Sequence, residues 1–269
     1  MKNTRRDFLK AAAVTSAGAL LIPSLASGAV KKKTASNRHA IHLKDESVIL
    51  FQGDSVTDAN RDRKIGEPNN PLAIGNGYAL FATGHMLDKF AERKLNIYNR
   101  GLSGNRVFEL RERWDEDCIA LKPDVVSILV GVNDYAYTLD NGYKGTLEKF
   151  VTDYRELLYY TKQKLPNVQL IICEPYTLKG GSHIKPRRWY PMFDEYRKAT
   201  KQLAGEFKAF YVPFQTMYDK AIKKAPDRYW SVDGIHPELP GAKLMANGWL
   251  KKTGLNKKVK KKKENDSNS

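Results

Sequence analysis

Four short blocks, spread in a fixed order over most of the chain, carry residue types that can act together on a carbonyl group. They are Gly53-Asp54-Ser55, Gly101-Leu102-Ser103-Gly104-Asn105, Gly131-Val132-Asn133-Asp134 and Asp233-Gly234-Ile235-His236-Pro237. The first offers a hydroxyl nucleophile, the next two offer N–H donors for a negatively charged oxygen, and the last offers a base beside a carboxylate. Each block alone is ordinary in a turn or at a helix end, so only their joint occurrence indicates this chemistry.

The hydroxyl of Ser55 becomes an effective nucleophile only when a neighbouring base removes its proton. His236 is the candidate base, because imidazole titrates near neutrality and can both accept and return a proton. Asp233 lies three residues earlier and can accept a hydrogen bond from the other ring nitrogen, which would fix the tautomer. Ser55, Asp233 and His236 are therefore the candidate catalytic residues.

Negative charge that develops on a carbonyl oxygen must be met by N–H groups that are already in position. The side-chain amide of Asn133 and the backbone N–H groups of Gly104 and Ser55 are the candidates for this oxyanion hole. The competing interpretation is structural, with Asn133 as a helix cap and Gly104 as a loop glycine.

Short apolar runs, rich in residues that favour strands, precede these blocks and predict buried strands. Five such runs are present, over 47–51, 96–99, 125–130, 168–173 and 210–212. Apolar residues at three- and four-residue steps predict helices over 78–90, 107–121, 147–165 and 193–207, and near 244–249. The alternation predicts a mainly parallel sheet with helices on both sides, whose ligands bind beyond the carboxyl ends of the strands.

The ordered set of blocks resembles the SGNH hydrolase family, also called GDSL esterases, which is named after Ser, Gly, Asn and His. These residues match Ser55, Gly104, Asn133 and His236, and Asp233 matches the acid of the family's Asp-x-x-His block. The resemblance covers about 48–249. It implies an α/β fold of flavodoxin-like type, a three-layer α/β/α sandwich with a five-stranded parallel sheet. It also implies ester hydrolysis through an acyl-serine, without a metal or other cofactor.

A loop over 179–190 follows the fourth predicted strand and combines aromatic rings with cations. Trp189 and Tyr190 could stack on a sugar ring, and Arg188 could meet a carboxylate, so these three are candidate substrate-binding residues. The sequence leaves an alternative equally open, in which the loop is solvated and Trp189 packs onto the next helix.

The N-terminal residues have the pattern of an export signal. Thr4-Arg5-Arg6-Asp7-Phe8-Leu9-Lys10 resembles the twin-arginine motif, an apolar run follows over 11–22, and small residues at 26–29 offer a cleavage site. The apolar run is shorter than the roughly 20 residues that cross a bilayer, so no stable membrane anchor is expected. We predict a twin-arginine signal peptide (1–29), a linker (30–46), the SGNH hydrolase domain (47–252) and a Lys-rich disordered tail (253–269), with a periplasmic or secreted product.

The formal net charge of +16 is concentrated in the leader, in residues 31–33 and in the residues from Lys251 onward. The predicted domain is only mildly basic, which argues against a nucleic-acid partner. The two cysteines, Cys118 and Cys173, lie in apolar patterns and are expected to be buried hydrophobic residues, although the sequence leaves their pairing open. No HExxH or CxxC motif occurs, so no metal site is expected.

Together, the residues and the resemblance predict a serine esterase that removes O-acetyl groups from a polysaccharide such as xylan or pectin. The expected partner is an acetylated carbohydrate or another ester, and the oligomeric state is not predicted. One alternative is a lysophospholipase or thioesterase of the same fold, and another is a non-catalytic glycan-binding protein.

Overall fold

The computed structural model describes residues 40–256, so the predicted signal peptide and nearly all of the predicted tail lie outside the described residues. Five parallel strands form one sheet in the order β2-β1-β3-β4-β5. Their bounds are β1 (Val48–Gly53), β2 (Asn96–Asn99), β3 (Val125–Leu129), β4 (Gln169–Cys173) and β5 (Phe210–Val212). All five predicted strands are confirmed, with small shifts at their ends.

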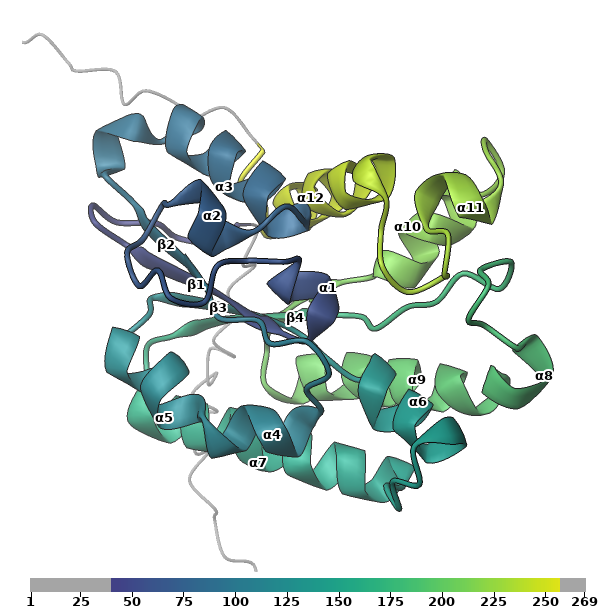
Figure 1. Ribbon diagram of the computed structural model, residues 1–269. Coiled ribbons are helices and arrows are strands. Elements are labelled where there is room, and N and C mark those ends of the chain that lie inside the picture. The colour runs from purple at the N-terminus through teal and green to yellow at the C-terminus, as the bar shows by residue number, and fades with distance from the viewer. Residues whose placement is uncertain (1–39, 257–269) are drawn as a thin grey trace, which may run out of the picture. The chain divides into compact units, whose positions relative to one another are not determined.

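Helices cover both faces of the sheet and complete the three-layer α/β/α sandwich (Figure 1). One face is covered by α3 (Tyr78–Lys89), α10 (Phe214–Ala221) and α12 (Leu239–Thr253). The other is covered by α4 (Val107–Glu112), α5 (Trp114–Asp117), α7 (Leu147–Lys164) and α9 (Met192–Glu206). The shorter elements are α1 (Ser55–Asp58), α2 (Pro71–Ile74), α6 (Val132–Asp140), α8 (Pro186–Trp189), α11 (Asp227–Trp230), η1 (Ala91–Arg93) and η2 (Ile119–Leu121).

The central strands are buried because their two faces feed two separate cores. Along β1, Ile49 and Phe51 point into the core beneath α3 and α12, whereas Leu50 points into the core beneath α4 and α7. This alternation follows from the two-residue repeat of a strand. A strand with apolar side chains on both faces is a continuous apolar run in the sequence, which is why β1 could be predicted.

The helix predicted over 107–121 is broken into α4, α5 and η2, and this correction has a local cause. Arg113 lies between α4 and α5 with φ −110° and ψ 8°, outside the helical region. Its guanidinium donates to Asn105 Oδ1 at 2.7 Å, to Arg100 O at 2.7 Å and to Asp117 Oδ2 at 2.6 Å. These hydrogen bonds hold Arg113, where the helix is interrupted, against the loop that follows β2.

The fold extends beyond the predicted domain limits of 47 and 252 at both ends. Ile41 and Leu43, placed in the predicted linker, are each only 5% exposed, and Leu255 is 3% exposed. The N–H of Ile41 donates to Thr253 O at 2.8 Å, so the two ends of the described chain lie side by side. Residues 40–46 are therefore part of the packed domain.

Candidate active site

Ser55 lies at the junction of β1 and α1, where the chain turns sharply at the carboxyl edge of the sheet. Gly53 has φ +151°, and a Cβ built there would lie 2.1 Å from Leu129 O of the neighbouring strand, so only glycine fits. Asp54 then caps α1, because its Oδ1 accepts a hydrogen bond from Val56 N at 3.0 Å. Ser55 is thus the first residue of a helix that begins directly at the end of a buried strand.

The structure brings Ser55, His236 and Asp233 together in one hydrogen-bonded row. Ser55 Oγ lies 2.7 Å from His236 Nε2, and His236 Nδ1 lies 2.6 Å from Asp233 Oδ2. An ionised carboxylate can only accept, so Nδ1 carries the proton and Nε2 of the neutral ring accepts from the Ser55 hydroxyl. This tautomer is the one that a general base for Ser55 requires.

The second oxygen of Asp233 organises the backbone of its own loop. Asp233 Oδ1 accepts from Ile235 N and from His236 N, each at 2.8 Å. The buried Ser231 Oγ lies 2.7 Å from His236 O and accepts from Gly234 N at 2.9 Å. The sequence analysis missed Ser231, although its place two residues before the acid, in a segment rich in turn residues, was the available signal.

Hydrogen bonding also sets the ionisation of this pair. Burial by itself would raise the pKa of Asp233, but the hydrogen bonds from the His236 ring and from the Ile235 and His236 backbone outweigh it and hold the pKa well below 3.8. The hydrogen bond to Asp233 raises the pKa of His236 above 6.5, in spite of burial. Asp233 is therefore ionised at neutral pH, and His236 is a stronger base than a free imidazole.

The three candidate oxyanion donors lie on three neighbouring segments at this edge. Ser55 N belongs to the first turn of α1, whose N–H groups have no partner within the helix. Gly104 lies in the loop after β2, and Asn133 lies in the first turn of α6. One N–H of the Asn133 amide donates to Asn105 O at 3.2 Å, which leaves its second N–H for a ligand.

Two carboxyl groups are buried beneath these donors. Asp54 and Asp134 are 1% and 3% exposed, and burial raises the pKa of each to about 7. Asp134 Oδ1 accepts from Val107 N at 3.1 Å and so joins the starts of α6 and α4. Each carboxyl group therefore stabilises the start of a helix, and their burial could not be predicted from the sequence.

The loop over 179–190 lies at the catalytic edge, but its tryptophan faces inward. Trp189 is 5% exposed and packs against Tyr135 and Phe193, with ring centroids 5.5 and 5.3 Å apart. This geometry favours the packing alternative over stacking on a sugar.

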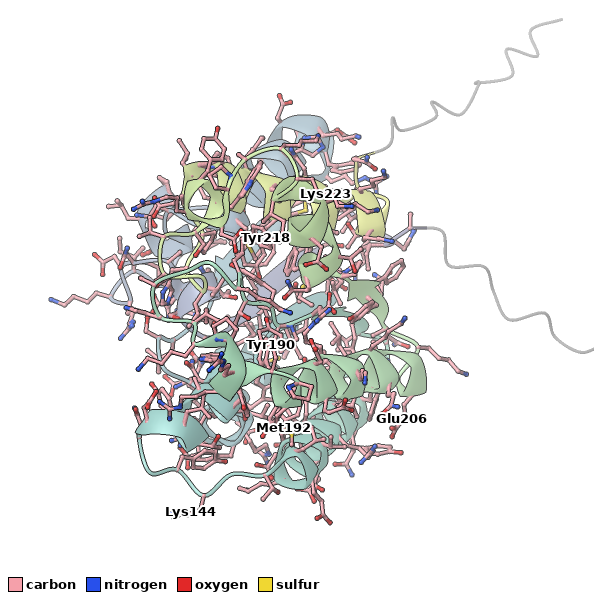
Figure 2. All side chains as sticks on the ribbon, turned by 90° about the vertical axis from the view of Figure 1, so that its right-hand side faces the viewer. Lys144, Tyr190, Met192, Glu206, Tyr218 and Lys223 are labelled. Atoms are coloured by element: carbon pink, nitrogen blue, oxygen red, sulfur yellow. The ribbon has the colours of Figure 1, made fainter. Side chains whose placement is uncertain are left out.

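Arg188 and Tyr190 lie nearer the surface and already have partners. Arg188 forms an ion pair with Asp140 at 2.7 Å, and the Tyr190 hydroxyl bonds to Thr177 Oγ1. Lys179 Nζ lies 4.3 Å from the centre of the Tyr190 ring. Figure 2 shows the side of the molecule that lies on the right in Figure 1. Tyr190 lies near the middle of this view, between Tyr218 and Met192. A substrate role for Arg188 and Tyr190 remains a prediction.

The same loop supports the loop that carries the candidate base. Backbone N–H groups of Leu178, Ser182 and His183 donate to Gly234 O, Val232 O and Asp233 O at distances of 2.8 to 3.1 Å. These main-chain bonds fix the segment between Val232 and Gly234. The backbone of the predicted substrate-binding loop therefore holds the loop that carries Asp233 and His236 in place.

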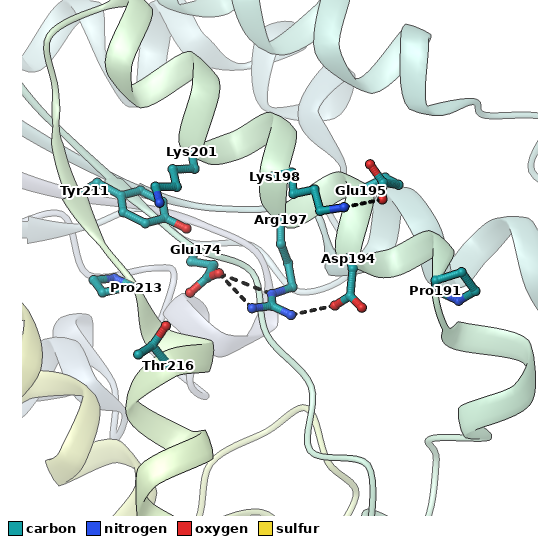
Figure 3. A pocket seen from close by; sticks show the side chains of 10 residues that line it. All are labelled: Glu174, Pro191, Asp194, Glu195, Arg197, Lys198, Lys201, Tyr211, Pro213 and Thr216. Atoms are coloured by element: carbon teal, nitrogen blue, oxygen red, sulfur yellow. Dashed lines mark hydrogen bonds and ion pairs between the residues drawn. The ribbon is translucent and has the colours of Figure 1, made fainter.

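A polar pocket lies beyond the ends of β4 and β5 (Figure 3). Its volume is about 410 Å³, and the ion pairs of Arg197 with Glu174 and Asp194 cross it. A second pocket of about 420 Å³ lies between α10 and α12. Neither is lined by Ser55 or His236, and half of the His236 side chain is exposed, so solvent reaches the candidate catalytic pair directly.

A parallel three-layer sandwich with a hydrogen-bonded serine, histidine and aspartate at its carboxyl edge defines the fold class of the SGNH hydrolases. Within that class, the model of the GDSL-like lipase/acylhydrolase family matches residues 51–244. The chain belongs to this family and is a carboxylic ester hydrolase.

Relatives of this chain include enzymes that act on acetylated xylan. An acetylxylan esterase of Geobacillus stearothermophilus is 31% identical over 211 residues, which cover 77% of this chain and 94% of that protein. Its crystal structure matches with a TM-score of 0.72, covering 81% of this chain and 99% of that one. A protein from Parabacteroides merdae, assigned to the GDSL-like lipases, is 55% identical with a TM-score of 0.80, covering 80% and 99%.

The leader matches the twin-arginine translocation signal over residues 2–21, so the protein is exported by that route to the periplasm or beyond. Across residues 40–256, no helix is long and apolar enough to cross a membrane.

Proposed function

We propose that the protein is an exported serine esterase that removes O-acetyl groups from a polysaccharide such as xylan or pectin through an acyl-serine intermediate. The single observation that carries the mechanism is the row of Ser55, His236 and Asp233, joined at 2.7 and 2.6 Å beside three N–H donors. The similarity to an acetylxylan esterase over most of the chain supports the choice of acetyl group and sugar polymer.

In the first half of the reaction, Ser55 Oγ attacks the ester carbonyl while His236 Nε2 takes its proton. Asp233 stabilises the imidazolium that forms. The N–H groups of Ser55 and Gly104 and the amide of Asn133 bind the oxyanion. The tetrahedral intermediate then collapses, its alcohol oxygen takes the proton from His236, and the acetyl group stays on Ser55.

In the second half, water attacks the acetyl-serine and gives its proton to His236. The second oxyanion is held by the same donors, and its collapse returns the proton to Ser55 Oγ and releases acetate. The exposed position of the site supports a polymer substrate, because a sugar chain can approach without entering a cavity.

The test of this proposal is Ser55→Ala. We expect the variant to fold as the wild type does, by circular dichroism and melting temperature, and to release no acetate from 4-nitrophenyl acetate. Turnover equal to that of the wild type would overturn the mechanism.

The substrate class is tested by acetate release from a panel of acetylated xylan and pectin, together with a chain-length series of 4-nitrophenyl esters. We expect the highest kcat/KM with acetyl esters. An optimum at long acyl chains would favour a lysophospholipase or thioesterase instead. Retained glycan binding without hydrolysis of any ester would favour a glycan-binding protein.

A further inference from the structure

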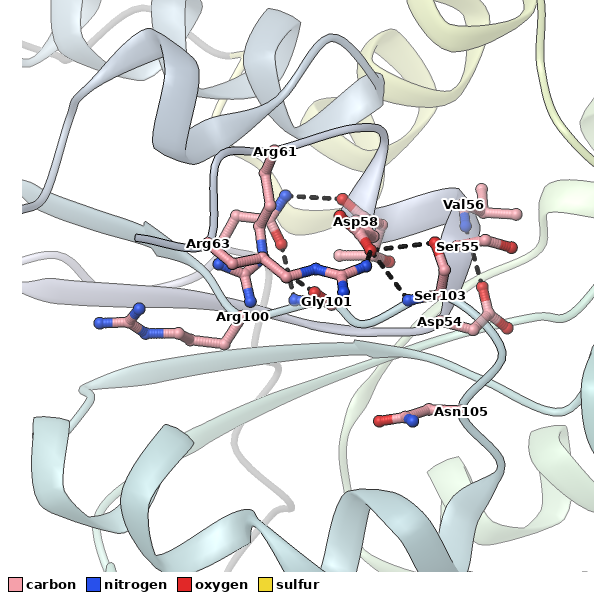
Figure 4. Close-up of polar contacts among 12 residues, drawn as sticks. Asp54, Ser55, Val56, Asp58, Arg61, Arg63, Arg100, Gly101, Ser103 and Asn105 are labelled. Atoms are coloured by element: carbon pink, nitrogen blue, oxygen red, sulfur yellow. Dashed lines mark hydrogen bonds and ion pairs between the residues drawn. The ribbon is translucent and has the colours of Figure 1, made fainter. Parts of the chain in front are cut away.

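One buried carboxylate joins the helix that carries the nucleophile to the loop that carries an oxyanion donor (Figure 4). Asp58, the last residue of α1, is 1% exposed. Its Oδ2 accepts from Ser103 N and from Ser103 Oγ, each at 2.9 Å, and also from the guanidinium of Arg63. Three donors therefore converge on one oxygen, and two of them come from the residue directly before Gly104.

The backbone of the same loop is held at two further points, one at the end of β1 and one on the segment that follows α1. Leu102 N donates to Gly53 O at 3.0 Å, and Nε of the partly buried Arg61 donates to Gly101 O at 2.8 Å. Gly101 itself lies so close to α1 that a Cβ built on it would be 2.4 Å from Asp58 N. The loop and the helix therefore form one rigid unit at the end of β1.

This unit leaves the backbone N–H of Gly104 free, since no acceptor within residues 40–256 takes a hydrogen bond from it. The direction of that N–H relative to Ser55 is set by the residue before it, which Asp58 holds. Hydrogen bonds to an ionised acceptor are stronger and shorter than neutral ones. A displacement of about 1 Å between reacting groups can cost about 100-fold in rate.

Asp58 keeps its charge in this buried place. Burial would raise the pKa of the Asp58 carboxyl group, but the hydrogen bonds from Ser103 and from Arg63 outweigh burial and hold the pKa below 3.8. The carboxylate is thus available as a charged acceptor throughout the pH range in which His236 works.

We propose that Asp58 is a positioning residue of the oxyanion hole, which fixes the Ser103–Gly104 peptide so that the Gly104 N–H and the Ser55 N–H point at the same oxygen. The proposal rests on the proposed function, because it concerns the same reaction. Asp58 touches no reacting atom, and its effect passes through Gly104.

The test is a graded series of variants assayed on 4-nitrophenyl acetate. Ser103→Ala keeps the backbone bond to Asp58 and should lower kcat by less than about threefold. Asp58→Asn keeps the shape but loses the charge, and should lower kcat about tenfold. Asp58→Ala loses every bond and should lower kcat about 100-fold, close to the loss of one oxyanion donor. KM should stay within about twofold throughout.

A second measurement separates positioning from mere support of the fold. Trifluoroacetone adds to an active serine and forms a charged hemiketal, so its Ki reports on the oxyanion hole. We expect Ki to rise by the same factor by which kcat falls. Asp62→Ala is the matched control, since Asp62 lies in the same segment, is exposed and, within residues 40–256, its side chain accepts only from Lys64 N.

An Asp58→Asn or Asp58→Ala variant that folds and keeps wild-type kcat would overturn the proposal. So would a fall in kcat that leaves the Ki of trifluoroacetone unchanged. If Ser55→Ala is inactive while the Asp58 variants are fully active, only the positioning role fails. If Ser55→Ala retains activity, the proposed function itself fails.

Discussion

At the scale of single residues, the proposed mechanism makes the reactivity of Ser55 depend on the charges of His236 and Asp233. His236 must be neutral to accept the serine proton, and its hydrogen bond to Asp233 raises its pKa above 6.5. Asp233 loses its proton far below that pH. As the pH rises from acid, the last ionisation before activity is therefore the loss of the proton from His236.

We expect kcat/KM to rise with pH along a limb centred above pH 6.5, because kcat/KM reports the ionisation of the free enzyme. Asp233→Asn removes the interaction that raises this pKa, so the limb should move to lower pH while the plateau falls by about three to four orders of magnitude. Glu238→Gln, next to the same loop, is the control and should leave the limb in place. A limb that does not move in Asp233→Asn would contradict the assignment.

The proposed oxyanion role of Asn133 leads to a separate expectation. Asn133→Ala should lower kcat about 100-fold or more, with little change in KM, because the amide donates chiefly when negative charge develops. Steady-state kinetics on 4-nitrophenyl acetate measures both constants. Asn141→Ala, at the other end of the same helix, should be unaffected. A variant at position 133 with turnover within about twofold of wild type would exclude this role.

Residue types with a chemical role could be identified from the sequence, whereas residues that act through geometry could not. Ser55, Asp233 and His236 stand in blocks whose spacing pointed to them, and the structure brings them together. Asp58 bonds to the backbone and side chain of Ser103, which is distant in sequence, and Ser231 bonds mainly to backbone atoms of its own loop. Such bonds leave no periodic pattern in the sequence, because any aspartate or serine in a turn looks the same.

At the scale of elements, the short helix α1 begins with the candidate nucleophile Ser55. The residue that caps its start, Asp54, lowers the stability of the fold at neutral pH. Asp54 accepts from Val56 N and so stabilises the start of the helix. The same carboxyl group is buried, which raises its pKa from 3.8 to about 7. A group whose pKa is raised in the folded state makes the fold less stable as the pH rises from about 4 to about 7.

Asp54→Asn should remove this pH dependence, because asparagine still offers an oxygen to Val56 N but carries no charge. We expect the variant to be more stable than the wild type at pH 8, by an amount on the order of a few kcal/mol, and the difference to shrink toward pH 4. Urea unfolding at several pH values measures this. Asp45→Asn, at an exposed carboxylate, is the control. A constant difference across this range would show that Asp54 does not titrate as described.

Strands were easier to predict than helices for a physical reason. The three central strands, β1, β3 and β4, are buried and mostly apolar runs, which a parallel sheet covered on both faces requires. The apolar residues over 107–121 have helical spacing, but the helix is interrupted at Arg113. The guanidinium of Arg113 donates hydrogen bonds to Asn105 Oδ1 and Arg100 O in the loop after β2, and these bonds hold the interruption in place. Side-chain partners that are distant in sequence cannot be read from periodicity.

At the scale of the whole molecule, the sheet divides the interior into two cores and keeps the two thiols apart. Cys118 belongs to the core beneath α4 and α7, and Cys173 to the core beneath α3 and α12. Both are free and fully buried, which settles the pairing that the sequence left open. Burial raises the pKa of Cys173 to about 12, so its thiolate is scarce at neutral pH.

We therefore expect the melting temperature to be the same with and without a reductant. A thiol reagent such as Ellman's reagent should label neither cysteine in the folded protein and both in denaturant. Cys118→Ala and Cys173→Ala should each lower stability through a lost packing contact, without altering the response to reductant. A drop in melting temperature on reduction would contradict the separation of the thiols.

The pairing of Ile41 with Thr253 has a practical consequence for handling this enzyme. His42 bonds to Gln169 at the amino end of β4, whereas Ser55 follows the carboxyl end of β1, so both ends of the described residues, 40 and 256, lie on the side of the sheet opposite the Ser55 hydroxyl. Immobilisation on a solid support through either end would present the serine outward. A fusion partner or purification tag attached at that pole leaves the approach of a polymer unobstructed.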